Sequence, residues 1–316
     1  MKGSRPLGRA LSGLFLLALL LPAGAVADGS HQRIVAFGDS LVDSGNVFVL
    51  TGRLAHKPYL PVPDAPYPIG GPQFSNGPTW VEQLAKKLGA EPSTGPSLRA
   101  NGVFTNYAFG GARAGAGGNS PSLSAQVGMF FADFGCSTPP NTLFAIAIGG
   151  NDLRAVFEAE DPTEVPDIVA GLINGLTDNL IALVNCGATD FVVANLPNLA
   201  AVPVFLGLPE PQRMAVSEFV NARNLEVEAV LAEIDDIPGV NVAIVDGFTL
   251  STEIANPARA RELGFKAGTE PCLKFGVEED AICNDRDAHF YWDGIHPTRA
   301  GHALIAERAL EAVTAD

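Results

Sequence analysis

The stretch Ile34-Val35-Ala36-Phe37-Gly38-Asp39-Ser40-Leu41 decides the fold of this 316-residue chain. Its first four residues form an apolar run of strand length, without the alternation expected of a strand that has one face in water. Glycine, aspartate and serine follow at once, so Ser40 is expected at the carboxyl end of a buried strand. Open α/β sheets bind their ligands at that end of their strands. The stretch therefore predicts a parallel sheet with a serine at its ligand-binding edge.

A second motif, Asp293-Gly294-Ile295-His296-Pro297, lies near the other end of the chain. A serine hydroxyl is a weak nucleophile on its own, because it needs a neighbouring base, and that base needs a carboxylate to orient it. We therefore expect Ser40 to be a nucleophile, His296 its base and Asp293 the orienting carboxylate. This hydrolytic site can form only if the two ends of the chain meet in the fold.

Apolar strand-like runs alternate with helical patterns along the chain. The runs are largely aliphatic, and most are bounded by Gly, Asn or Asp. The expected strands are Arg33–Phe37, Val103–Ala108, Leu143–Ile148, Asp190–Ala194 and Val240–Val245. Between them, apolar residues repeat at spacings of three and four, which is typical of helices. The expected helices are Thr79–Leu88, Val165–Val184, Pro211–Ile234 and Thr298–Val313. This alternation predicts a doubly wound α/β layer fold.

Two segments do not follow the alternation. Leu54–Asn76 is rich in Pro and Gly and is expected to be a long surface loop, and Glu270–His289 is a polar insertion with two cysteines. Long loops in compact domains often shape a binding site. Because the sequence has no internal repeat and no low-complexity linker, residues 28–316 are expected to form a single domain.

The first residues have the pattern of a targeting segment. Three basic residues precede the apolar run Leu14–Leu21, and Ala25-Val26-Ala27 offers a small-residue cleavage site. A membrane anchor is the alternative, but the run is shorter than the ~20 residues of a spanning helix and is interrupted by Pro22 and Gly24. We therefore expect a cleaved signal peptide over residues 1–27 and a secreted or periplasmic protein.

The four cysteines suggest two disulfides in an oxidising compartment, for which three pairings exist. Cys272–Cys283 is expected because it closes a short polar loop, and Cys136–Cys186 then follows by elimination. A metal site is the alternative, but the sequence has no Cys-x-x-Cys motif and no Cys–His cluster. No metal and no organic cofactor are expected.

Two further turns lie where predicted strands end. Asn106–Ala112 and Gly149–Asp152 are rich in glycine, and the ends of adjacent parallel strands lie side by side. Acyl transfer needs hydrogen-bond donors aimed at the oxyanion of the tetrahedral intermediate. The backbone N–H of Gly111, which no Cβ shields, the side-chain amide of Asn151 and the N–H of Ser40, at the start of an expected helix, are the candidates.

These pieces, in this order, resemble the GDSL family of serine esterases and lipases, also called SGNH hydrolases. The matching blocks are Phe37–Leu41 with Asp43–Asn46, then Asn106–Ala112, Gly149–Asp152 and Asp293–His296. The family often has Thr in place of Ser44. The spacing and the Tyr-Trp-Asp-Gly-Ile-His-Pro-Thr ending look most like the lipase/acylhydrolase branch that plant enzymes share with bacterial autotransporter esterases.

The resemblance implies a three-layer α/β/α, flavodoxin-like fold with a central five-stranded parallel sheet. It makes Ser40, Asp293 and His296 the catalytic residues and Gly111 and Asn151 oxyanion donors. Autotransporter members continue into a membrane barrel, whereas the stretch after His296 is too short for one, so we expect a soluble product. The Gly-x-Ser-x-Gly elbow of α/β-hydrolases is absent at Ser40.

The expected function is that of a secreted serine esterase or lipase acting on small-molecule or lipid esters. The formal net charge of −15 disfavours nucleic acid and anionic membranes as partners. No integral membrane segment is expected after signal cleavage, and the protein is expected to be a monomer. A polysaccharide O-acetyl esterase or an acyltransferase on the same site is the alternative. A non-enzymatic binding protein is disfavoured, because a site that had lost its catalytic function would not need to keep all five residues, namely Ser40, Gly111, Asn151, Asp293 and His296.

Other polar and aromatic residues are expected to have structural roles. Asp39 and Asp152 should fix their turns, and Tyr291 and Trp292 should pack in the core rather than line an acyl pocket. His31, His56 and His289 are expected on the surface or in loops, and His302 is expected to face solvent or to help packing.

Overall fold

The computed structural model describes residues 31–315, together with Met1 and Gly3. The predicted signal peptide over residues 1–27 therefore falls outside the described residues, apart from those two positions.

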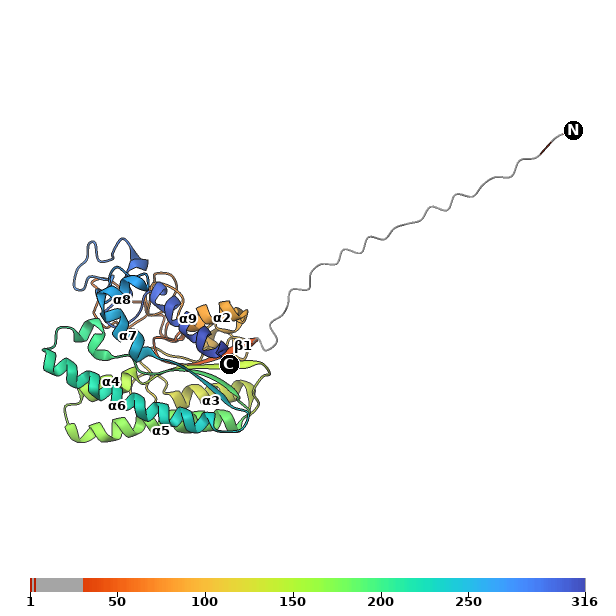
Figure 1. Cartoon of the computed structure of the whole chain (residues 1–316), viewed down its shortest axis with the longest axis horizontal. Coiled ribbons are helices and arrows are strands. Elements are labelled where there is room, and N and C mark those ends of the chain that lie inside the picture. The colour runs from red at the N-terminus through yellow and green to blue at the C-terminus, as the bar shows by residue number, and fades with distance from the viewer. Residues whose placement is uncertain (2, 4–30, 316) are drawn as a thin grey trace. The chain divides into compact units, whose positions relative to one another are not determined.

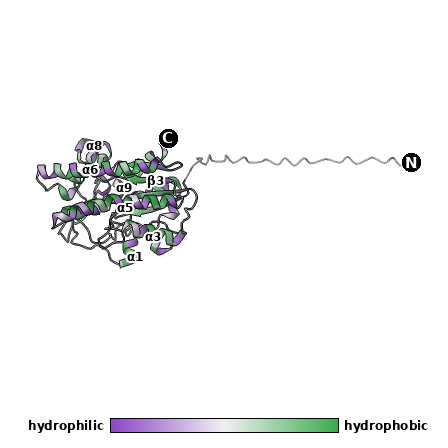
Figure 2. Cartoon of the chain, turned by 90° about the horizontal axis from the view of Figure 1, so that it is seen from below, coloured by the Kyte–Doolittle hydropathy of each residue, from purple (hydrophilic) through white to green (hydrophobic). Residues whose placement is uncertain are grey.

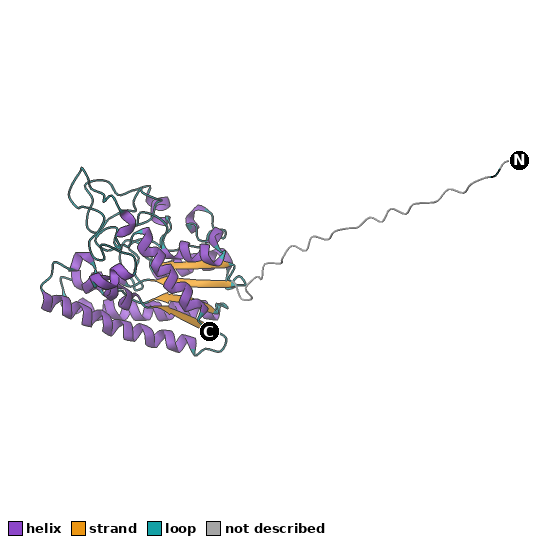
Figure 3. Ribbon diagram, turned by 45° about the horizontal axis from the view of Figure 1, so that its top comes forward, coloured by secondary structure: helices purple, strands orange, loops and turns teal. Residues whose placement is uncertain are grey.

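Four parallel strands form the central sheet (Figure 3). Their order in the sheet equals their order in the chain, and each lies within one residue of its predicted bounds at either end. They are β1 (Arg33–Gly38), β2 (Thr142–Ala147), β3 (Asp190–Ala194) and β4 (Asn241–Val245).

The fifth predicted strand, Val103–Ala108, is not a regular strand. Its Asn106 makes a single parallel bridge to Ala36 of β1, so the segment runs along the free edge of that strand. Around this bridge, Thr105 and Tyr107 exchange backbone hydrogen bonds with Ala36. Side chains occupy the neighbouring donors of β1, because the N–H of Ile34 donates to Oγ of Ser93 and the N–H of Gly38 donates to Oε1 of Gln126, so the ladder stays short. With this segment beside β1, the strand order is that of a flavodoxin-like fold.

Helices cover both faces of the sheet (Figure 1). One face carries α3 (Leu123–Phe134), α4 (Gly150–Glu158), α5 (Val165–Asn185) and α6 (Glu210–Asp235). The other carries α2 (Trp80–Leu88) and α9 (Arg299–Thr314). The sequence patterns predicted α2, α5, α6 and α9 but not α3 and α4, nor the shorter α1 (Asn46–Thr51), α7 (Gly247–Ala255) and α8 (Pro257–Glu262).

Successive side chains of β1 point to opposite faces of the sheet, so alternate residues of the strand pack in different hydrophobic cores. Phe37 packs edge-on against Phe130 of α3, with 6.0 Å between the ring centroids. Ile34 and Ala36 belong to the other cluster, with Trp80 of α2. The chain therefore has the predicted three-layer α/β/α architecture, with four regular strands in place of five.

One described helix, Pro162–Asn185, is long and apolar enough to cross a membrane, with a mean hydropathy of 1.4. Its residues Leu172, Leu176 and Leu180 lie in the main hydrophobic core. Figure 2 shows polar and apolar residues mixed along the outer surface of α5 and α6. We therefore interpret this segment as a core helix of the α/β fold.

The two disulfides pair the cysteines as the sequence predicted. Cys136 bonds Cys186 and ties the segment after α3 to the end of α5, and Cys272 bonds Cys283 within the late insertion. The prediction that Leu54–Asn76 is a surface loop is wrong for much of the segment. It has no helix or strand, but several of its residues are buried, namely Tyr59, Ala65, Tyr67, Gln73, Phe74, Ser75 and Asn76.

Candidate functional site

Ser40, His296 and Asp293 form a continuous chain of hydrogen bonds. Nε2 of His296 lies 2.8 Å from Oγ of Ser40, and Nδ1 of His296 lies 2.7 Å from Oδ2 of Asp293. His296 and Asp293 are buried, whereas Ser40 is partly exposed. The structure thus brings the two ends of the chain together, in the arrangement by which a base can activate a serine and a carboxylate can orient the base.

The end of β1 positions Ser40 through a sharp turn. Gly38 has φ +150°, and a Cβ built there would lie 2.2 Å from the carbonyl oxygen of Ala147 in β2, so only glycine fits. The carbonyl of Asp39 then accepts hydrogen bonds from the N–H groups of Val42 and Asp43. This single turn holds the serine at the sheet's edge. The prediction that Ser40 starts a helix is wrong, because the next helix, α1, begins only at Asn46.

Asp43 connects the serine turn to the glycine-rich turn of the neighbouring segment. Its carboxylate accepts hydrogen bonds from the N–H groups of Gly45, Asn46 and Val47 and, at 3.0 Å, of Gly110. Burial raises the pKa of Asp43 to about 6, against the lowering effect of these four donors. Asp43 belongs to a sequence block that resembles the family, but the sequence predicted no role for it. The structure shows that it connects the serine turn with the glycine-rich turn.

The spacing Asp293-x-x-His296 has a local physical cause. Oδ1 of Asp293 accepts hydrogen bonds from the N–H groups of Ile295 and His296, both at 2.8 Å, which closes an Asx-type turn. The other carboxylate oxygen remains for the imidazole. The N–H of Trp292 donates to the carbonyl of His296 at 2.7 Å and completes the turn. One carboxylate thus shapes the backbone and holds the ring.

Tyr67 is a site residue that the sequence did not predict. Its hydroxyl donates a 2.8 Å hydrogen bond to Oδ2 of Asp293, the oxygen that also faces the imidazole. The ring is fully buried, and burial together with Asp293 raises the pKa of the Tyr67 hydroxyl well above its usual value. The two residues lie 226 positions apart, so no local pattern could have connected them.

The rest of the Leu54–Asn76 loop wraps the histidine turn. The N–H of Gly294 donates to the carbonyl of Pro61 at 2.8 Å, and Oγ of Ser75 donates to the carbonyl of Pro297 at 2.8 Å. The ring of Phe74 lies 5.5 Å from the imidazole of His296, centroid to centroid. These contacts explain why the loop is buried: it forms one wall around the Asp293–His296 turn.

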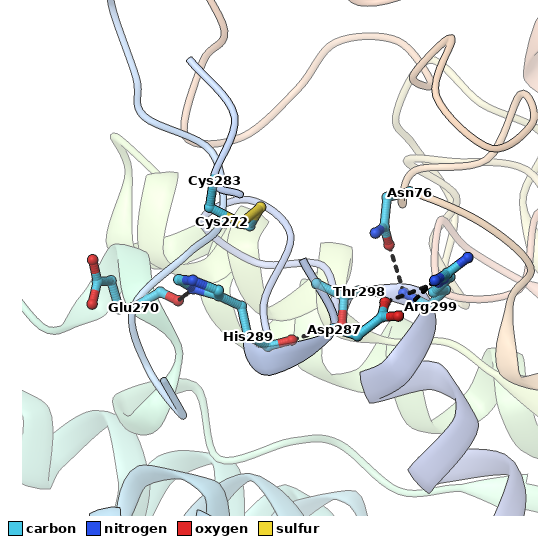
Figure 4. Close-up of a disulfide and its surroundings, with 8 residues drawn as sticks. All are labelled: Asn76, Glu270, Cys272, Cys283, Asp287, His289, Thr298 and Arg299. Carbon is cyan, nitrogen blue, oxygen red and sulfur yellow. Dashed lines mark hydrogen bonds and ion pairs between the residues drawn. A yellow bond between two sulfur atoms is a disulfide. The ribbon is translucent and has the colours of Figure 1, made fainter. Parts of the chain in front are cut away.

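The late disulfide segment binds residues on both sides of the Asp293–His296 turn in the sequence (Figure 4). Nδ1 of His289 lies 2.9 Å from the carbonyl of Glu270, and Oγ1 of Thr298 donates to the carbonyl of His289 at 2.8 Å. Arg299, the first residue of α9, forms a two-point ion pair with Asp287. The residues before Asp293 and the helix after His296 are therefore fastened to one insertion.

The oxyanion candidates lie at the ends of neighbouring segments. Gly111 has φ +80°, and Nδ2 of Asn151, at the start of α4, donates to the carbonyl of Ala112 at 2.9 Å. Within residues 31–315, no acceptor is recorded for the backbone N–H of Ser40 or of Gly111. Asp152 accepts hydrogen bonds from the N–H groups of Ala114 and Gly115, at 2.9 and 3.0 Å, and so fixes the neighbouring segment, whereas its own turn was the one expected.

A cavity of about 250 Å³ opens beside Ser40. Asn151 and His296 share its wall, and most of its remaining lining is hydrocarbon: Leu41, Val62, Phe157, Pro197, Leu199, Val202, Val204, Phe205 and Ile295. Gly111 is not among its lining residues. A roomier groove of about 860 Å³ lies between α2 and α9 but contains neither Ser40 nor His296. We place the candidate site at the smaller cavity, because the hydrogen-bonded chain is there.

Two buried ionisable groups flank the site. Burial raises the pKa of Asp39, which lines the cavity, to about 6 against the lowering effect of the N–H of Leu41 and of His296. Burial lowers the pKa of His302 to about 3, and its Nδ1 accepts a hydrogen bond from the N–H of Trp80 at 3.2 Å. Of the two roles expected for His302, it therefore has the packing role.

Among the described residues, no group of three or more His, Cys, Asp or Glu side chains is arranged to hold a metal ion. Tyr291 and Trp292 are buried. The Trp292 ring packs edge-on against Tyr67 at 5.8 Å, which agrees with the packing role expected for it.

Comparison with known proteins places these features in a family. The model of the GDSL-like lipase/acylhydrolase family matches residues 34–309. A GDSL esterase/lipase of Arabidopsis thaliana is 27% identical, over 91% of this chain and 90% of that protein. A thermolabile hemolysin of Vibrio parahaemolyticus is 26% identical, over 89% of this chain and 63% of that protein. Among solved structures, an acetylxylan esterase from Geobacillus stearothermophilus aligns over 91% of this chain and 96% of its own, with a TM-score of 0.48 and 15% identity.

Proposed function

The chain belongs to the GDSL-like lipase/acylhydrolase family and is a carboxylic ester hydrolase, and we propose that it is an exported esterase or lipase working through Ser40, His296 and Asp293. The observation that carries the proposal is the hydrogen-bonded chain from Oγ of Ser40 through the imidazole to Oδ2 of Asp293. A serine so connected, at the mouth of a largely apolar cavity, suits attack on an ester carbonyl.

The proposed reaction has two steps. Nε2 of His296 takes the Ser40 proton as Oγ attacks the carbonyl carbon, and Asp293 holds the imidazole in the tautomer that this requires. The imidazolium then protonates the departing alcohol, and an acyl group remains on Ser40. In the second step His296 takes a proton from water as the water oxygen attacks the acyl carbon, and it returns that proton to Oγ of Ser40 as the bond between Oγ and the acyl carbon breaks and the acid leaves.

The backbone N–H groups of Ser40 and Gly111 and the amide of Asn151 are the proposed donors to the oxyanion. The two backbone groups have no recorded acceptor within residues 31–315, and Nδ2 of Asn151 uses one of its two hydrogens on Ala112. Donors fixed in this way need no rearrangement when charge develops on the substrate oxygen.

Export is the proposed setting of the enzyme, with residues 28–316 as a single catalytic domain. Support comes from the leader-like pattern of residues 1–27 and from the two disulfides, which persist in oxidising compartments. In this proposal the exported protein acts on esters as a monomer and without a cofactor.

Hydrolysis of a p-nitrophenyl ester series from acetate to palmitate tests the proposal. The protein without residues 1–27 should turn over at least part of the series, and Ser40→Ala should lose activity by several orders of magnitude. Ser44→Ala, also in the block after β1 but outside the hydrogen-bonded chain, is the control and should stay active. Equal activity of the wild type and Ser40→Ala would refute the role of Ser40. Turnover of acetate alone would favour the O-acetyl esterase alternative.

A further inference from the structure

A second apolar cavity, of about 70 Å³, lies against the first one. Four residues form part of the wall of both cavities: Leu41, Pro197, Val202 and Ile295. We propose that this inner cavity is a subsite for the distal carbons of a fatty acyl chain and that these four shared residues form the passage into it. The proposal deepens the proposed function and rests on it.

The position of the catalytic candidates determines which part of an ester could enter. Ser40 and His296 line the outer cavity and not the inner one, so a reacting carbonyl would lie in the outer cavity. Ser40 is followed directly by Leu41, and His296 is preceded directly by Ile295. An acyl chain that extends from the carbonyl and passes between the side chains of Leu41 and Ile295 enters the inner cavity.

The part of the outer cavity that does not border the inner one suits the alcohol portion of the ester better. Arg154 and Glu158 also line the outer cavity, and they form an exposed ion pair with 2.7 Å between Nε and Oε1. An apolar chain gains nothing beside this hydrated pair, whereas a polar alcohol would remain in contact with water there. The acyl chain is therefore assigned to the inner cavity.

Apart from the hydroxyl of Tyr291, for which residues 31–315 show no hydrogen-bond partner, the inner cavity offers a ligand no unused polar side chain. Its wall is mostly hydrocarbon and includes Leu250 of α7 and Ile305 of α9. The side chain of Asn195 accepts from the N–H of Phe248, and Oγ of Ser251 accepts from the N–H of Asn198 and lies within hydrogen-bond distance of the carbonyl of Gly247. Because the side chains of Asn195 and Ser251 are satisfied within the fold and most of the remaining wall is hydrocarbon, an apolar chain fits the cavity without breaking a hydrogen bond of either residue.

The test fills the inner cavity without touching the outer one. Ile305→Trp enlarges a partly buried side chain that lines only the inner cavity. Leu304→Trp is the matched control, because Leu304 is the adjacent residue of α9, is also partly buried, and lines neither cavity. Leu250→Trp, on another helix, provides a second filling variant should Ile305→Trp fail to fold.

We expect Ile305→Trp to lower kcat/KM for p-nitrophenyl decanoate by about tenfold or more, because apolar pockets discriminate by roughly tenfold or more for each methylene they hold or exclude. Its kcat/KM for the butyrate ester should stay at the wild-type value. Leu304→Trp should leave the ratio between the two esters unchanged. An equal effect of Ile305→Trp on both esters, or an equal change of the ratio in Leu304→Trp, would overturn the proposal.

Binding gives a readout that does not depend on hydrolysis. Decanoate titrated calorimetrically should bind wild type and Leu304→Trp alike and Ile305→Trp at least about tenfold more weakly. If no variant hydrolyses any ester but this binding difference appears, the proposed function fails while the subsite stands. If butyrate is hydrolysed and decanoate binds all three proteins equally, the enzyme stands and the subsite is refuted.

Discussion

The hydroxyl of Tyr67 and the imidazole of His296 meet at one atom, Oδ2 of Asp293, at 2.8 and 2.7 Å. The other oxygen of Asp293 is occupied by two backbone N–H groups. The carboxylate therefore has four hydrogen-bond donors and no access to water. Tyr67 adds to the stability of the ionised form, and it fixes the direction in which Oδ2 points at the ring.

Tyr67→Phe should lower kcat by about tenfold, because Oδ2 of Asp293 loses the hydrogen bond that fixes its direction towards the imidazole, and a hydrogen bond to a charged group contributes roughly 1.5–3 kcal/mol. KM should change little, since Tyr67 does not line the substrate cavity. The Asp293 carboxylate, with one donor fewer, should attract the proton of the imidazolium more strongly. The acid limb of the pH–rate profile should therefore move to higher pH. Steady-state kinetics over a pH series measures both effects.

Tyr59→Phe is the control for Tyr67→Phe. Tyr59 is also buried and packs edge-on against Tyr67 at 5.6 Å, but within the described residues no hydrogen bond of its hydroxyl is recorded. This variant should keep both kcat and the pH profile. An unshifted profile in Tyr67→Phe, or the same loss in both variants, would show that Tyr67 acts only through packing.

Asn151→Ala should lower kcat by about 10²–10³, the usual loss for one oxyanion donor. Because Asn151 also lines the cavity, a several-fold rise in KM is compatible with the proposal, but the larger effect should be on kcat. Asn179→Ala removes a buried amide that bonds Ser124 and Gly175, away from the site, and serves as the control for general loss of packing. Kinetics with a short ester measures both variants. A loss confined to KM would remove Asn151 from the oxyanion set.

The sheet and the local turn around His296 were predictable from the sequence because both depend on short-range patterns. β1 consists of Arg33, four apolar residues and a glycine, and the turn that holds His296 closes through a carboxylate only three residues away. The long helices have apolar residues at clear spacings of three and four. Short helices such as α4, which begins in a glycine turn, had too few apolar positions to show a period.

The supporting parts of the site could not be read from local patterns. Tyr67 reaches Asp293, and Ser75 reaches the carbonyl of Pro297, across more than 220 residues. A segment rich in Pro and Gly is typical of an exposed loop, and only the tertiary contacts show that this one is buried. The irregular fifth strand has a similar cause, because the backbone N–H of Gly38 in β1 donates to the side chain of Gln126, which lies far away in the sequence, and not to the segment beside it.

Asp39→Asn should stabilise the protein at neutral pH. The pKa of Asp39 is raised to about 6 from 3.8, so the folded state binds its proton more tightly than the unfolded state. The stability of the wild type therefore falls as pH rises from about 3.8 to 6, and the cost persists above that range. Asparagine carries no charge and can still accept the N–H of Leu41. Urea unfolding should show a gain of up to about 3 kcal/mol at pH 7.5 and almost none at pH 3.5. An equal change at both pH values would contradict the argument.

His302→Asn should make the protein more resistant to acid. Burial lowers the pKa of His302 to about 3 from 6.5, so below pH 6.5 the unfolded state binds a proton that the folded state refuses. Stability is therefore complete above pH 6.5 and is lost progressively as pH falls towards 3, by about 2 kcal/mol at pH 5. In the variant, Oδ1 of asparagine can accept the N–H of Trp80 as Nδ1 does in the wild type.

The measurement for His302→Asn is urea unfolding at pH 7.5 and pH 5. The difference in stability between the two pH values should be about 2 kcal/mol smaller in His302→Asn than in the wild type. His56→Asn is the control, because His56 is exposed and its replacement should leave that difference unchanged. A loss of stability in His302→Asn that is equal at both pH values would mean that the variant damages packing. An unchanged pH dependence would mean that His302 takes up its proton in the folded state.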